Sequence, residues 1–136
     1  FFFKQKTAYE IVDCDWSSDV CSSDLDASAC SGKIKTMIEQ KWGTVEAWSE
    51  QFAATGLCSR GWVILAYDKD TKEIDTYLCD LHNQGGIWNS VPLLIMDVYE
   101  HAYFIDYATT RKDYVSAFMQ VIDWDVVNKR AENLIN

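Results

Sequence analysis

Asp97 and His101 stand four residues apart, directly after the apolar run VPLLIM at residues 91–96. Residues at this spacing share one face of a helix, so a helical turn here would bring a carboxylate and an imidazole together. Such a pair can bind a borderline metal such as manganese or iron. Asp97 is also a good N-cap, and Glu100 could complete a variant capping box with it. From spacing alone, this capping interpretation is favoured over metal binding.

Two helices and a hairpin precede this pair. Apolar residues at three- and four-residue spacing predict a helix from Lys33, ended by Gly43, and a second helix capped by Thr44 and ended by Gly56. The apolar positions of the two helices are Ile34, Met37, Ile38 and Trp42, then Val45, Trp48 and Phe52. The run GWVILAYD at 61–68, a turn at 68–72 and an alternating segment at 73–81 predict an antiparallel hairpin.

The pattern after residue 81 predicts a third strand and further helices. Residues 82–89 have a loop composition with room for a short turn of helix, and 91–96 are apolar on both faces, as in a covered inner strand. Pro92 fits an edge or strand-entry position. The helical segments that follow are expected to turn inward Ala102, Ile105, Tyr114, Phe118, Val121 and Ile122, with Tyr103 and Phe104 as further candidates. Asp123 or Asp125 can cap the last helix.

These elements predict an α+β domain, in which a small three-stranded, mainly antiparallel sheet is covered by helices in the order α-α-β-β-(α)-β-α-α. The predicted domain occupies residues 26–136. Residues 1–25 differ in character, because KQKTAYEI and DWSSDVCSSDL resemble the conceptual translation of a sequencing adaptor, and they lack the plan of a secretory signal. We expect that segment to be non-native.

Composition excludes several classes of function. The formal net charge is −9, and the first 25 residues contribute −3 of it, so residues 26–136 carry −6. An acidic domain disfavours binding to nucleic acid or an anionic membrane, and no apolar run approaches the roughly 18 residues of a membrane span. Cys30, Cys58 and Cys79 form neither a disulfide framework nor a zinc pattern, so we expect reduced thiols and an intracellular, cytoplasmic protein.

The segment DVYEHAYFIDY, residues 97–107, closely resembles the signature of iron/manganese superoxide dismutases. Further segments resemble the same family in its order, namely SGKIKTMIEQKWGTVEAWSEQF, SRGWVILAYDK, HNQ before VPLLIMD, TTRKDY and FMQVIDWDVV. The likeness covers most of residues 31–135 and specifically the family's carboxy-terminal domain. It reverses the preference for a capping role at Asp97.

The resemblance implies a role for each matching residue. Asp97 and His101 match the two metal ligands that this domain contributes, and Glu100 matches the acid that orients a His ligand of the other subunit in a homodimer. Gln84 matches the glutamine that hydrogen-bonds metal-bound solvent in the manganese type, so manganese is favoured over iron. Arg111 matches an arginine near the substrate entrance, where it would steer superoxide.

The aromatic residues of the expected site depart from the family pattern at two positions. Trp62 matches an aromatic wall, Tyr99 stands where the family usually has Trp, and Phe104 stands where it usually has a gateway Tyr. Tyr99 keeps an aromatic wall, whereas Phe104 removes a proton-bearing group from the entrance. Structural alternatives stay open for Gln84 as a loop amide, for Trp62 as a core residue and for Arg111 as a solvated charge.

The activity that the resemblance implies is dismutation of superoxide to dioxygen and hydrogen peroxide at a manganese or iron ion. The family's site also uses two imidazoles from an amino-terminal half, whereas this chain contains only His82 and His101, and His82 matches no family ligand. We therefore expect a fragment of the enzyme that is inactive alone. One alternative is a metal-free relative acting as an interaction or ribosome-associated module, and another is a zinc hydrolase on a related scaffold.

Overall fold

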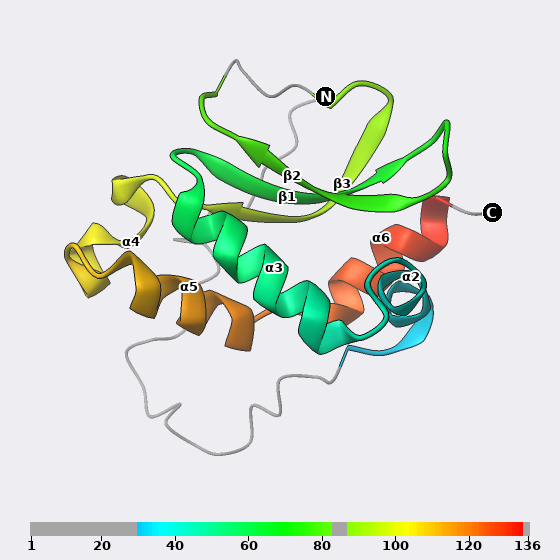
Figure 1. The fold of residues 1–136 in the computed structure, drawn as a ribbon, viewed down its shortest axis with the longest axis horizontal. Helices are drawn as coiled ribbons and strands as arrows, with labels where there is room; N and C mark the ends of the chain where they lie inside the picture. The colour runs from blue at the N-terminus through cyan, green and yellow to red at the C-terminus, as the bar shows by residue number, and fades with distance from the viewer. Residues whose placement is uncertain (1–29, 83–86, 135–136) are drawn as a thin grey trace.

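The computed structural model describes residues 30–82 and 87–134, which form five helices and three strands (Figure 1). In chain order these are α2 (Gly32–Trp42), α3 (Val45–Cys58), β1 (Trp62–Asp68), β2 (Ile74–Cys79), β3 (Ser90–Asp97), α4 (Glu100–Tyr107), α5 (Arg111–Gln120) and α6 (Trp124–Leu134). The predicted α+β class and the order of elements are confirmed, with three helices after β3 where the predicted order had two. The predicted non-native segment 1–25, and residues 83–86 of the loop in which a turn of helix was predicted, lie outside the described residues.

The sheet is antiparallel throughout, with strand order β2-β1-β3. Because β1 is the middle strand, Trp62 pairs with Cys79 on one side and with Asp97 on the other. The prediction that residues 91–96 form an inner strand is therefore wrong in position, since β3 lies at the edge of this sheet. Pro92 explains the difference, because a residue without an N–H suits an edge strand. The apolar composition of β3 reflects burial by helices.

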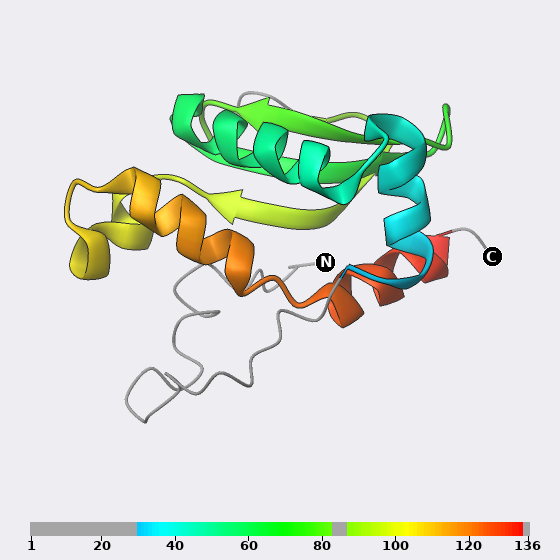
Figure 2. The same cartoon turned by 60° about the horizontal axis from the view of Figure 1, so that its bottom comes forward.

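The helices α2, α3, α5 and α6 lie together on one side of the sheet (Figures 1 and 2). α3 packs against β1 and β2, α6 packs against β3, and α5 joins the layer through α3. Val63, Leu65 and Tyr67 alternate along β1 and are buried in the core, whereas Trp62 and Ile64 on the opposite face are half-buried. This period of two is the signature of a strand with one fully covered face.

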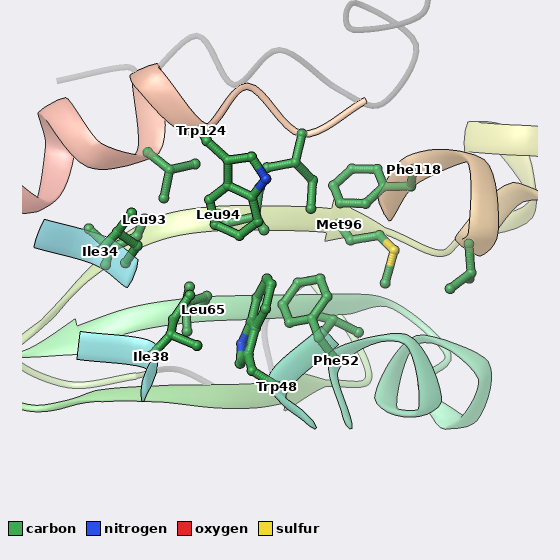
Figure 3. Close-up of a cluster of buried hydrophobic side chains, with 14 of the residues drawn as sticks. Ile34, Ile38, Trp48, Phe52, Leu65, Leu93, Leu94, Met96, Phe118 and Trp124 are labelled. Carbon is green, nitrogen blue, oxygen red and sulfur yellow. The ribbon is translucent and has the colours of Figure 1, made fainter. Parts of the chain in front are cut away.

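Figure 3 shows the core that fixes β3 to the helical layer. The Trp48 ring lies 5.1 Å from the ring of Phe52 and 5.4 Å, edge-on, from that of Trp124. Leu65 and Met96 are fully buried in the same cluster. Burial of each such side chain contributes about 1.5–3 kcal/mol. The strand that ends in Asp97 is therefore held from α3, β1 and α6 at once.

The predicted helix boundaries are partly confirmed. Gly43 ends α2 with φ +84°, and the Thr44 hydroxyl accepts a 3.0 Å hydrogen bond from the Ala47 N–H at the start of α3. The prediction that Gly56 ends the second helix is wrong, because α3 continues to Cys58. Gly56 is buried within the helix, where an added Cβ atom would clash with Cε of Met96. Its small size serves packing instead of chain termination.

The later helices differ from prediction in which side chains they bury. Ala102 and Tyr103 are buried as predicted, but Phe104, Ile105 and Val121 are exposed. α4 packs mainly on α5, so only a narrow face of it is covered. Asp123 is confirmed as the cap of α6, since its carboxylate accepts a 3.1 Å bond from the Val126 N–H, and Asp125 lies within the first turn. Within residues 30–82 and 87–134, no helix has the length and apolar character needed to cross a bilayer.

Candidate metal centre

Asp97 sits at the junction between the end of β3 and the start of α4. The chain leaves the sheet with a 2.9 Å bond from the Val98 N–H to the Gly61 carbonyl. Asp97 Oδ1 then accepts a 3.0 Å bond from the Tyr99 N–H. α4 begins at Glu100 with Tyr99 as its N-cap residue, and Tyr99 makes no side-chain cap. The capping box between Asp97 and Glu100 is therefore wrong, because Asp97 closes a turn before the helix and Glu100 is the first helical residue.

The side chains of Asp97 and His101 converge. Nε2 of His101 lies 3.1 Å from Oδ2 of Asp97, the carboxylate oxygen that the Tyr99 N–H leaves open. The two side chains differ in solvent access, with 62% of the His101 side chain exposed and 1% of that of Asp97. A buried strand end thus presents one carboxylate oxygen, and the first turn of a surface helix brings an imidazole nitrogen to it.

Electrostatics at Asp97 favour a nearby cation. Burial raises the pKa of the Asp97 carboxyl, and the hydrogen bond from the Tyr99 N–H and the neighbouring His101 offset this only in part. A positive ion beside Oδ2 would stabilise the ionised form. Carboxylate and imidazole are donor types that suit manganese and iron, so the pair fits such an ion as two of its ligands. The described part of the chain contains no group of three or more His, Cys, Asp or Glu side chains that could hold a metal.

A buried hydroxyl holds the backbone of Asp97 in place. Tyr114 on α5 donates a 2.7 Å hydrogen bond to the Asp97 main-chain carbonyl, and its ring stacks on that of Tyr103 at 5.2 Å. Burial raises the pKa of Tyr114 well above its ordinary value, so the hydroxyl remains a donor. Sequence reasoning assigned Tyr114 only to the core. No spacing signal distinguishes a core tyrosine from one that supports a ligand.

Arg111, at the start of α5, is anchored within the domain. Its Nε donates to the Tyr103 hydroxyl at 3.2 Å, and its Nη1 donates to the Ser59 carbonyl at 2.7 Å. Ser59 is fully buried, and its own hydroxyl donates to the Trp62 carbonyl at 3.1 Å. Arg111 therefore links the end of α3 to the tyrosines beside Asp97. Sequence reasoning identified Arg111 but did not single out Ser59.

The structure brings together two of the three predicted wall residues. The Trp62 ring lies 6.1 Å from that of Tyr99, and Tyr99 stacks on His101 at 5.6 Å. Phe104 makes none of these ring contacts and is 53% exposed. Glu100 is also exposed, and its carboxylate makes no hydrogen bond or ion pair with the described residues. Gln84 lies outside the described residues.

Comparison with known proteins identifies the relatives of this domain. Residues 30–130 match the family described as iron/manganese superoxide dismutases, C-terminal domain. Superoxide dismutase [Mn] 2 of Haloferax volcanii is 38% identical over 104 residues, which are 76% of this chain and 52% of that protein. Superoxide dismutase [Mn] of Haloarcula marismortui is 36% identical over 105 residues, 77% of this chain and 52% of the relative. Superoxide dismutase [Fe] of Aquifex aeolicus is 37% identical over 102 residues, 75% and 48% of the respective chains.

These matches agree with the resemblance carried by residues 97–107 and with the predicted α+β fold. The chain spans about half the length of the curated relatives that it matches. It belongs to the iron/manganese superoxide dismutase family, and the part that matches is the family's C-terminal domain.

Proposed function

We propose that residues 26–136 supply half of the metal centre of a superoxide dismutase, with Asp97 and His101 as two ligands of a manganese or iron ion. The observation that carries this proposal is the 3.1 Å approach of His101 Nε2 to Asp97 Oδ2. Two side chains from different elements thus place a nitrogen and an oxygen within hydrogen-bond distance of each other, and both are donor types for such an ion. The relatives include proteins named for manganese and for iron, so both ions are consistent with the matches.

The bound ion would supply one-electron redox chemistry, which converts superoxide to dioxygen and hydrogen peroxide. This chain would hold and tune that ion. The Tyr99 N–H bonds Asp97 Oδ1, and Oδ2 is the carboxylate oxygen that faces His101 and would bind the ion. His101 must be neutral with its proton on Nδ1 for Nε2 to bind a metal. The hydrogen bond from Tyr114 holds the strand end that carries Asp97.

Other residues of the proposed site have supporting roles. Gln84 would hydrogen-bond metal-bound solvent, which favours manganese. Glu100 is exposed at the start of α4, beside His101, where it could reach a His ligand in a second copy of the protein. We propose a homodimer through this region. Arg111 would give the positive potential that attracts superoxide to an acidic protein while it braces the site.

Two protein ligands leave most positions around an ion to water, so this domain alone would bind a metal weakly and exchange it readily. The relatives are about twice as long as the matched region. We propose that dismutase activity belongs to a protein of that length, in the cytoplasm, whose other half supplies the remaining imidazoles. The aromatic contacts of Trp62 and Tyr99 would form one wall of that completed site, with Phe104 towards its entrance.

Manganese titration tests the proposal on this chain directly. Mn²⁺ binding is followed by electron paramagnetic resonance for the chain, for Asp97→Asn and His101→Ala, and for Asp106→Asn as a control. The side chain introduced by Asp97→Asn can still accept the hydrogen bond from the Tyr99 N–H. Asp106 is a suitable control because it is an exposed carboxylate on α4, the helix that carries His101. We expect weak binding that Asp97→Asn and His101→Ala abolish and Asp106→Asn leaves intact. Binding that is equally strong in all four proteins would refute the assigned ligands.

A further inference from the structure

His82 has a ring contact that the proposed chemistry does not use. Its imidazole lies nearly parallel to the Tyr99 ring, with centroids 4.7 Å apart and planes 22° apart. Tyr99 lies nearly parallel to His101 in turn, at 5.6 Å and 14°. Trp62 meets both His82 and Tyr99 edge-on, at 5.7 and 6.1 Å. Four rings from the start of β1, the segment after β2 and the start of α4 therefore form one connected group beside Asp97.

Tyr99 is the shared member of this group, and it is anchored at its far end. Its hydroxyl donates a 3.3 Å hydrogen bond to the main-chain carbonyl of Asp80, two residues before His82. The same short segment after β2 therefore contacts both the hydroxyl and the ring of Tyr99. A ring fixed in this way gives His101 a defined surface to lie against.

His101 needs such a surface, because 62% of its side chain is exposed. Its Nε2 faces Asp97, but one 3.1 Å contact does not fix the plane of an imidazole that is otherwise in water. A ligand held in its binding orientation before the ion arrives loses less conformational freedom on binding. Offset stacking between aromatic rings supplies an orientation preference of this kind.

We propose that His82 is a positioning residue for the ligand pair, acting through Tyr99 to fix the ring plane of His101, an inference that rests on the proposed metal-binding function. The contacts of His82 in the described structure are ring contacts, with Tyr99 and with Trp62, and a positioning role accounts for both of them. Its stacked face offers a π surface, whereas a ligand would direct a nitrogen lone pair at the ion. A ring without nitrogen should therefore do the same work.

The orientation of His101 can be measured without any metal. The chain contains only two histidines, so His82→Ala and His82→Phe each leave His101 as the single imidazole in a proton NMR spectrum. At one fixed pH, we expect His82→Ala to weaken the nuclear Overhauser contacts between the His101 and Tyr99 rings, and His82→Phe to restore them. Trp88→Ala is the control, because Trp88 is 90% exposed and belongs to none of the described ring pairs. Unchanged ring contacts in His82→Ala would overturn the proposal.

Mn²⁺ affinity provides the second measurement on the same four proteins. We expect His82→Ala to weaken binding about twofold to tenfold, the range that one aromatic pair accounts for. His82→Phe and Trp88→Ala should bind like the unaltered chain. A loss in His82→Phe equal to that in His82→Ala would overturn the positioning role in favour of a role for the His82 nitrogens. If the unaltered chain binds no Mn²⁺, the proposed function fails on this chain, and the metal-free ring contacts still decide the role of His82.

Discussion

The hydroxyl of Tyr114 on α5 donates a 2.7 Å hydrogen bond to the main-chain carbonyl of Asp97, at the end of β3. The bond is buried and joins a helix to the strand end at the residue that carries the proposed carboxylate ligand. The hydrogen bonds of a sheet stop at the end of a strand, so a buried carbonyl there needs a donor from another element, and Tyr114 supplies it. Stability of the domain and placement of the ligand are therefore linked at this contact.

Tyr114→Phe removes this bond while keeping the ring. We expect the free energy of unfolding to fall by about 1–3 kcal/mol, because the buried Asp97 carbonyl loses its side-chain donor. Urea unfolding measures the change, and Mn²⁺ affinity should fall with it. Tyr107→Phe is the matched control, because Tyr107 contacts the Tyr114 ring edge-on and no hydrogen bond of its hydroxyl is seen in the described structure. Equal stability of the two variants would contradict the role given to the Tyr114 hydroxyl.

Gly61 and Gly56 offer a test of where the fold has no room for a methyl group. A Cβ atom on Gly61 would lie 2.6 Å from the Cys79 carbonyl oxygen and 2.9 Å from that of Asp80, and neither backbone atom can move without disturbing the sheet. We expect Gly61→Ala to destabilise the domain by about 3 kcal/mol. Gly56→Ala should cost less, because it meets the end of the Met96 side chain and gains about 1 kcal/mol of helix propensity. Thermal unfolding measures the stability of both variants. A smaller loss in Gly61→Ala than in Gly56→Ala would show that the backbone around Gly61 can shift to make room.

Lys41 should give the domain a component of stability that depends on pH. Its ammonium bonds Asp75 at 3.1 Å and Glu73 at 3.3 Å, and the hydrogen bond to Asp75 is the main cause that raises the pKa of Lys41 above 10.5. The folded state thus favours the charged form, so the contribution is complete below pH 10.5 and is lost as pH rises through the raised pKa. We expect Lys41→Met to cost about 0.2–1 kcal/mol at neutral pH, because all three groups are partly exposed.

The measurement for Lys41 is urea unfolding of the unaltered chain and of Lys41→Met at neutral pH and above pH 11. The difference between them should shrink at the higher pH and also in high salt, which screens exposed charges. Lys35→Met serves as a control, since Lys35 has a single exposed partner, Glu39, at 3.8 Å. A difference that persists unchanged at high pH would contradict a contribution from the charge of Lys41.

Cys30 should be a slow thiol. Burial is the main cause that raises the pKa of its thiol from 9.0 to about 11, and nearby Glu39 adds to this. Because the thiolate is the reactive species, we expect alkylation near pH 8 to be about a hundredfold slower than in the unfolded chain. Variants that retain only Cys30 or only Cys58 are treated with iodoacetamide, with and without urea. Cys58 is exposed and should react at similar rates with and without urea. A half-buried Cys30 that reacts as fast in the folded chain as in urea would contradict this prediction.

Arg111→Lys separates charge from bracing. Lysine keeps the positive charge but cannot reach both the Ser59 carbonyl and the Tyr103 hydroxyl with the fixed fork of a guanidinium. We expect a loss of about 1–3 kcal/mol in stability, since the Ser59 carbonyl loses a charged donor. In a full-length enzyme, the salt dependence of the rate should survive Arg111→Lys and disappear in Arg111→Gln. Loss of that dependence in both variants would contradict steering by charge.

Sequence patterns predicted the parts of this fold that are set by local periodicity and chain punctuation. Thr44 was assigned as a cap, and Asp123 was one of two candidates with Asp125, because capping depends on neighbouring residues alone. Gly56 was misassigned, since its reason for being small is Met96 on a distant strand. Phe104 and Ile105 were predicted to face inward but are exposed, because neighbouring elements cover only a small part of α4. The local sequence pattern contains no information about that coverage.

For the candidate site, the sequence predicted which two side chains lie together. Spacing and resemblance singled out Asp97 and His101, and the structure brings His101 Nε2 to 3.1 Å from Asp97 Oδ2. The supporting contacts were not predictable, because Ser59, Tyr114 and His82 act through hydrogen bonds and stacking between segments far apart in the chain. Such contacts depend on how the helical layer and the sheet are placed relative to each other.

The unequal solvent access of the two proposed ligands would also set the order in which they meet an ion. Under the proposed function, an arriving ion would meet the accessible imidazole of His101 before the buried oxygen of Asp97. Imidazole accepts zinc and copper ions more strongly than it accepts manganese or iron. A newly made domain would therefore be prone to mismetallation, with the resident ion decided by which metals the cell supplies while the remaining ligands assemble.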